Sequence, residues 1–184
     1  APPLKWLDPS NDRRISLLDR AIEHADNTAR YNVYFGEGRD SYDVRGRVAH
    51  EGVFNVTDGR YRCPSTQQGY SPFTTWTRGL AWVILGFAEQ LEFLRVVDDR
   101  ELEPHGGRAA VEGRFLAAAR ATADFYIENT SADGIPYWDT GAPGLVNLPD
   151  WREVPAQIDN DFEPVDSSAA AITARSGRPV ARAT

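Results

Sequence analysis

Residues 66–95 read TQQGYSPFTTWTRGLAWVILGFAEQLEFLR and contain the longest helical pattern of the chain. From Trp76 onward, apolar residues recur at steps of three and four, which predicts an α-helix with one broad apolar stripe against a core. Thr74, Thr75 and Thr77 are candidates to cap its first turn, because threonine oxygens accept hydrogen bonds from free backbone N–H groups. The stripe consists of Trp76, Leu80, Val83, Ile84, Phe87, Leu91 and Leu94.

Arg78 and Trp82 are four residues apart within this pattern, so they are neighbours on one helix face. A guanidinium group matches a carboxylate, and an indole face suits a sugar ring, so the pair fits an acidic sugar. The alternative is an arginine in a structural ion pair beside a core tryptophan.

Three sequence blocks, in order, resemble those of the unsaturated glucuronyl hydrolases, glycoside hydrolase family 88, and of the related unsaturated rhamnogalacturonyl hydrolases. The blocks are QGYSPFTTWTRGLAW at 68–82, YIENTSADGIPYWDTGAP at 126–143 and DSSAAAI at 166–172. The resemblance extends over most of the chain, from the second residue to position 174.

The resemblance implies an all-α fold, part of an (α/α)6 toroid, with a β-hairpin inserted before the central helix. Residues 1–184 are expected to form a single domain, the C-terminal portion of such a barrel. Apolar periodicity predicts further helices at about 11–31, capped by Ser10 or Asn11, and at about 108–129, with 96–107 as a polar loop. The hairpin turn is expected at residues 57–59, Thr-Asp-Gly.

The last residues look foreign to this fold. Asp166 and the two serines after it are expected to cap a helix, but Gly177 and Pro179 should end it after about two turns. Residues 175–184 are therefore predicted to be a non-native or disordered tail.

The resemblance also implies substrate contacts by His50, Gln68, Arg78 and Trp82, whose spacing matches the family pattern. Trp138, Asp139 and Asp166 are candidate cleft residues, although Trp138 can equally pack in the rim. The chain departs from the family at Gln67, where histidine is usual, and at Leu80, where glutamine is frequent. Trp151, Arg152 and Asp159 belong to a long loop at 140–165 that could modify the pocket.

The implied substrate is a lyase-generated oligosaccharide that ends in a 4,5-unsaturated uronic acid. In the family, an aspartic acid protonates C4 and helps water add at C5, after which the hemiketal opens and releases the next sugar. That aspartate is expected upstream of residue 1, so no catalytic residue is assigned in this chain. The alternatives are a truncated, non-catalytic carbohydrate binder and an unsaturated rhamnogalacturonyl hydrolase-like activity.

Composition and charge limit the classes of molecule that this chain is expected to bind. The net charge of −7 argues against nucleic acid and anionic membranes. The single cysteine, Cys63, is expected to be buried or idle, and the three histidines are too scattered for a metal site. No metal or other cofactor is called for, and partners beyond the sugar are self-association or the missing N-terminal half. A soluble protein of the bacterial cytoplasm or periplasm is expected, without a choice between these compartments.

Overall fold

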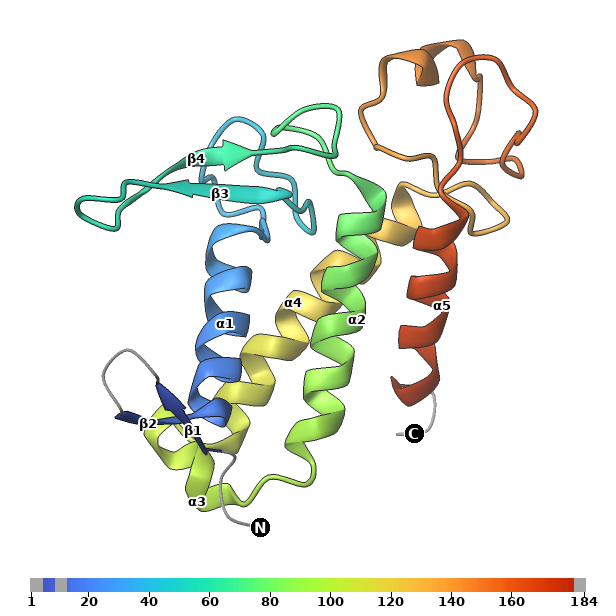
Figure 1. Cartoon of the computed structure of the whole chain (residues 1–184). Coiled ribbons are helices and arrows are strands. Elements are labelled where there is room, and N and C mark those ends of the chain that lie inside the picture. Colours follow the sequence, from blue (N-terminus) through green and yellow to red (C-terminus); the bar gives the residue numbers. More distant parts are fainter. Residues whose placement is uncertain (1–4, 9–12, 181–184) are drawn as a thin grey trace.

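The structure, a computed structural model, describes residues 5–8 and 13–180, and it is mostly helical, as the sequence predicts. Figure 1 shows the longer helices side by side, with a β-hairpin across the upper end of α1 and irregular loops above α5. The helices are α1 (Leu17–Tyr31), α2 (Thr77–Leu94), α3 (Asp99–Leu102), α4 (Arg108–Glu128) and α5 (Ser167–Val180), with 3-10 turns at Glu103–His105 and Pro143–Asn147. The strands are β1 (Lys5–Asp8), β2 (Arg13–Ser16), β3 (Glu51–Phe54) and β4 (Tyr61–Ser65).

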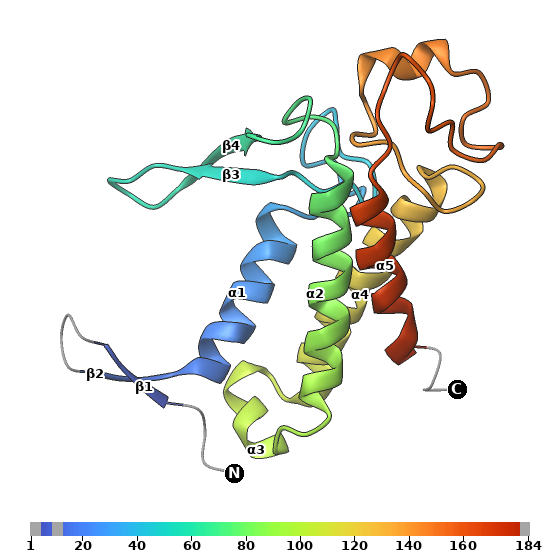
Figure 2. The ribbon, with the colours of Figure 1, turned by 45° about the vertical axis from the view of Figure 1, so that its right-hand side comes forward.

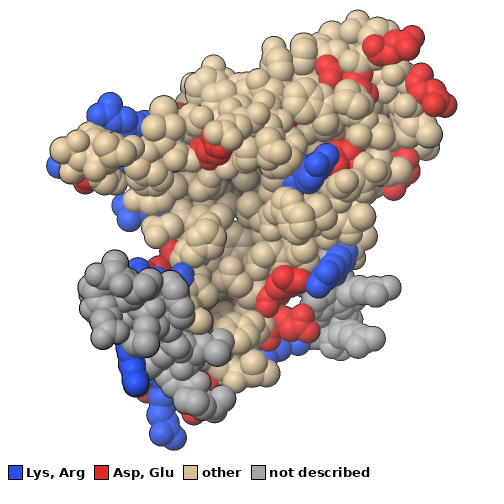
Figure 3. All heavy atoms as spheres, in the orientation of Figure 1, with Lys and Arg blue, Asp and Glu red and all other residues tan. Residues whose placement is uncertain are grey.

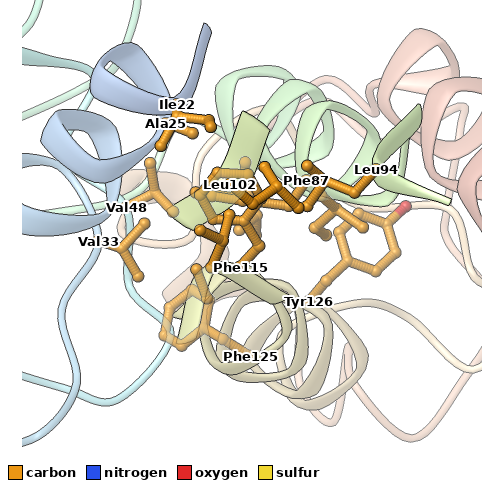
Figure 4. Close-up of a cluster of buried hydrophobic side chains, with 14 of the residues drawn as sticks. Ile22, Ala25, Val33, Val48, Phe87, Leu94, Leu102, Phe115, Phe125 and Tyr126 are labelled. Atoms are coloured by element: carbon orange, nitrogen blue, oxygen red, sulfur yellow. The ribbon is translucent and has the colours of Figure 1, made fainter. Parts of the chain in front are cut away.

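The main core lies between α1, α2 and α4, where the predicted stripe of α2 is buried. Figure 4 shows Phe87 of α2 and Phe115 of α4 among these side chains, and their rings meet edge to face at 5.7 Å. Burial of such side chains removes apolar area from water and supplies most of the stability of a helical pair. The predicted core face of α2 is therefore confirmed, with Leu80, Ile84, Phe87 and Leu94 buried.

The hairpin predicted before α2 is present as the antiparallel pair β3 and β4. Gly59 lies in its turn with a φ of 68°, a left-handed conformation that favours glycine. Cys63 of β4 is exposed, which excludes the buried state for its thiol. The hairpin lies over the C-terminal end of α1, and the connection after β4 leads to the N-terminal end of α2, as both views show (Figures 1 and 2).

The expected threonine caps of α2 are wrong. Trp76 occupies the N-cap position, and no side chain caps the helix. The threonine hydroxyls bond to other segments instead: that of Thr75 donates to the Val48 carbonyl at 3.2 Å, and that of Thr77 to the Tyr137 carbonyl at 2.8 Å. These hydroxyls therefore fasten the start of α2 to neighbouring loops.

The predicted limits at both ends of the chain are also corrected. The first helix begins at Leu17 rather than near residue 11, because Arg13–Ser16 is extended and pairs with β1. Ser16 is its N-cap, and its hydroxyl accepts the Asp19 N–H; residues 9–12, which include Ser10 and Asn11, lie outside the described residues. At the other end α5 continues to Val180, since a proline near a helix end removes a single hydrogen bond. Residues 181–184 of the predicted tail lie outside the described residues.

Two further predictions concern single segments. The helix expected at about 108–129 is confirmed as α4. The segment at 96–107 is not only loop, because the side chain of Asp98 caps the short helix α3 by accepting the Arg100 N–H. Within the described part of the chain, no helix is long and apolar enough to cross a membrane.

Candidate functional site

The site is built around the N-terminal end of α2, where residues 137–140 run alongside the helix start. Trp76 and Asp139 form an antiparallel bridge, the Thr77 N–H donates to the Trp138 carbonyl, and the Thr140 N–H donates to the Thr75 carbonyl, both at 3.0 Å. The first of these bonds satisfies the Thr77 N–H, one of the N–H groups at the helix start that have no partner within the helix. Trp76 is thereby fixed in position as the last extended residue before α2.

His50 packs its ring against Trp76, with centroids 4.8 Å apart and planes tilted by 58°. Its Nδ1 accepts the Gln67 N–H at 3.3 Å and lies 3.2 Å from the Thr66 hydroxyl. A neutral imidazole that accepts at Nδ1 carries its proton on Nε2. Nε2 has no hydrogen-bond partner among the described residues, so it can donate to a ligand.

Arg78 also lies beside Trp76, with its guanidinium carbon 5.8 Å from the indole centroid. Its Nε donates to Asp166 Oδ2 at 2.9 Å, and the side chain of Arg78 is 44% exposed whereas that of Asp166 is 2% exposed. Asp166 Oδ1 also accepts the Ala169 N–H at 2.9 Å, which confirms the expected cap of α5. His50, Trp76, Arg78 and Asp166 thus form one continuous row, hereafter the α2 row.

Trp82 and Gln68 are close to this row in the sequence: Gln68 follows Gln67, whose N–H bonds His50, and Trp82 lies one helical turn beyond Arg78. Trp82 is 55% exposed, so it is not the core tryptophan of the alternative interpretation, although the ion pair of that interpretation is present. Its ring borders a hollow of about 230 Å³ between α1 and α2. Gln68 is exposed as well.

Trp138 and Asp139, the remaining predicted cleft residues, are held by the surrounding loops. The indole N–H of Trp138 donates to Glu163 Oε2 at 2.6 Å. Asp139 is completely buried, with Oδ2 accepting the Tyr70 N–H and Oδ1 accepting the Gly141 N–H, both at 2.9 Å. The Asp139 carboxylate therefore shapes the loop beside Trp76 and does not face an open cleft.

Trp76 is the site residue that the sequence analysis missed. Its position in the apolar stripe assigned it to the core, but its place at the helix N-cap turns the ring toward His50 and Arg78. Trp76 comes two residues before Arg78 in the sequence, but helical spacing alone does not mark where the helix begins. In the structure, Gly69 lies close to this tryptophan, since a Cβ at position 69 would be 3.1 Å from the Trp76 Cβ.

One face of the molecule carries little charge over its centre. In Figure 3, most of the central surface is neither acidic nor basic, and charged side chains lie mainly toward its borders. Among the described residues, no group of three histidine, cysteine or acidic side chains could hold a metal ion. A larger hollow, about 590 Å³, lies elsewhere between α1, α4 and the loop after α1, where Asp26 pairs with Arg114.

Comparison with known proteins gives relatives of one kind. The chain is 28% identical over 131 residues to an unsaturated glucuronyl hydrolase of Formosa agariphila, covering 70% of the chain and 26% of that protein. It is 31% identical over 125 residues to the unsaturated glucuronyl hydrolase of Bacillus sp. strain GL1, covering 68% of the chain and 25% of that protein. The chain thus spans about a quarter of the length of these relatives, and no family model matches it.

The fold is similar to that of a solved protein. The crystal structure of the unsaturated glucuronyl hydrolase from Bacillus sp. GL1 superposes with a TM-score of 0.55 and 24% identity, over 87% of this chain and 32% of that one. At 24% identity, this similarity is evidence of a shared fold and not of a shared activity. Together with the two sequence relatives, it confirms the resemblance of this chain to the unsaturated glucuronyl hydrolases.

Proposed function

We propose that this chain forms the uronate-binding part of a glycoside hydrolase site for lyase-generated oligosaccharides ending in a 4,5-unsaturated uronic acid. The observation that carries the proposal is the α2 row, in which a half-exposed arginine and an imidazole flank one indole. The similarity to unsaturated glucuronyl hydrolases supports the same substrate class. The four long helices would form part of an (α/α)6 toroid.

Each side chain has a role that follows from its chemistry. The guanidinium of Arg78 would bind the uronate carboxylate, because a planar fork matches two carboxylate oxygens. Trp76 and Trp82 offer apolar ring faces to the sugar. His50, through Nε2, and the exposed amide of Gln68 would donate hydrogen bonds to hydroxyl groups.

The reaction would be hydration of the double bond followed by opening of the resulting hemiketal. An aspartic acid protonates C4, water adds at C5, and the aglycone leaves when the ring opens, so the carboxylate spacing of ordinary glycosidases does not apply. Such an acid needs a pKa near the working pH. We assign it to a part of the enzyme outside these residues, in line with the quarter of the relatives' length that the chain spans.

A second function, carbohydrate binding without catalysis, is favoured by the state of the two carboxylates beside Trp76 and Arg78. Asp139 is buried on two backbone N–H groups, and Asp166 is committed to Arg78 and Ala169. Both carboxylates are thereby occupied by structural hydrogen bonds, and neither is presented to a ligand as a free acid. Asp159, the third acid considered from the sequence, is exposed on the long loop.

The test uses purified chain and unsaturated disaccharides from chondroitin, heparin and rhamnogalacturonan, with a neutral disaccharide as control. Calorimetry measures binding, and ultraviolet absorbance follows the conjugated double bond. We expect binding of at least one unsaturated uronide and none of the neutral sugar, with stable absorbance. Loss of absorbance would instead place the acid within this chain, and absence of binding to every uronide would contradict the proposal.

A further inference from the structure

We infer that Asp166 is a positioning residue that aims Arg78 at a carboxylate; the inference rests on the proposed function and adds a specificity determinant to it. Asp166 comes from α5 and Arg78 from α2, two helices that pack side by side (Figure 2). The ion pair therefore joins two residues that are 88 positions apart in the sequence.

The geometry divides the guanidinium into a held side and a presented side. Only Nε donates to Asp166, at 2.9 Å to Oδ2 and 3.3 Å to Oδ1. Neither terminal nitrogen of Arg78 has a hydrogen-bond partner among the described residues, and the side chain is 44% exposed. The two terminal N–H₂ groups form the end of the fork that can bind a carboxylate with two parallel hydrogen bonds.

The held side is rigid because Asp166 has a second task. Its Oδ1 accepts the Ala169 N–H at 2.9 Å and so caps α5, while the carboxylate itself is 2% exposed. A carboxylate fixed by a helix cap has little rotamer freedom, and it transmits that order to the guanidinium bound to it. Binding then requires less ordering of the long arginine side chain, which would otherwise reduce affinity.

The arrangement also predicts selectivity for the shape of the anion. Asp166 balances the charge of Arg78, so attraction by net charge is weak, and geometric matching contributes most of the preference. A uronide carboxylate should bind better than its methyl ester, in which one oxygen is blocked.

The decisive variant is Asp166→Asn. Asparagine keeps one oxygen, which can retain the cap on the Ala169 N–H, but it places an NH₂ group where Oδ2 now faces the Arg78 Nε–H. The helix cap and the arginine link are thereby separated. A matched control is Asp26→Asn, which weakens the bidentate Asp26–Arg114 pair between α1 and α4, at 2.9 Å for both bonds.

Calorimetry with an unsaturated chondroitin disaccharide and its methyl ester tests the inference. For Asp166→Asn we expect at least tenfold weaker binding of the acid, unchanged binding of the ester and an unchanged helical circular dichroism spectrum, whereas Asp26→Asn binds both as the wild type does. Equal losses for acid and ester would reduce Asp166 to a structural residue, and no loss for the acid would overturn the inference. If the wild-type chain binds neither compound, the proposed function itself fails.

Discussion

At the scale of single residues, the site depends on where one indole lies. Trp76 lies close to both an imidazole and a guanidinium. Within the described part of the chain, the Nε2 of that imidazole and the two terminal nitrogens of that guanidinium have no hydrogen-bond partner. The sequence predicted His50 and Arg78 as partners of one ligand, and the structure brings both to the same ring. The sequence could not reveal the role of Trp76, because helical spacing alone does not separate the last extended residue from the first helical one.

Replacement of Arg78 by lysine tests whether geometry or charge binds the ligand. Lysine keeps the positive charge but lacks the planar fork and the Nε that Asp166 holds. We expect Arg78→Lys to weaken binding of an unsaturated uronide at least tenfold, about 1.4 kcal/mol, with little change in melting temperature. Calorimetry measures the first quantity and thermal unfolding the second; affinity equal to that of the wild type would show that the charge alone is sufficient.

At the scale of elements, the helices were more predictable than their ends. Apolar periodicity gave α2 and α4, because both bury a stripe against the same core. The predicted threonine caps of α2 failed, since the hydroxyls of Thr75 and Thr77 bond to segments distant in the sequence. Such long-range partners have no local signal.

The loop after α1 is fitted to α4 so closely that one glycine is required. Gly46 has a φ of 84°, and a Cβ there would lie 2.0 Å from the Ala121 carbonyl oxygen and 2.5 Å from the Phe125 Cβ. Gly38 has a similar φ of 82° but no atom within 4 Å of its would-be Cβ. The pair therefore separates backbone strain from steric overlap.

We expect Gly38→Ala to reduce the free energy of unfolding by about 1–2 kcal/mol, the cost of a left-handed conformation. Gly46→Ala should lose about 1–3 kcal/mol more, because overpacking adds to the same strain. Urea unfolding monitored by circular dichroism measures both values. Equal losses for the two variants would show that the loop and α4 move apart freely, contrary to the packing described here.

At the scale of the whole molecule, helical class, hairpin and family resemblance could be predicted from the sequence. Three sequence blocks were sufficient for the resemblance. Each lies at a junction between elements: the start of α2, the loop after α4 and the start of α5. The sequence could not predict the pairing of Arg78 with Asp166 or the burial of Asp139. Both result from the packing of these junctions against one another.

The central claim is that the N-terminal end of α2 binds the unsaturated uronide. The most direct measurement is a ¹H–¹⁵N chemical-shift titration of the labelled chain with an unsaturated chondroitin disaccharide. The account predicts the largest shifts at the Trp76 indole N–H, the Arg78 Nε–H and the backbone N–H of Gln67 and Gln68. Shifts confined to the larger hollow between α1 and α4, around Asp26 and Arg114, would contradict it.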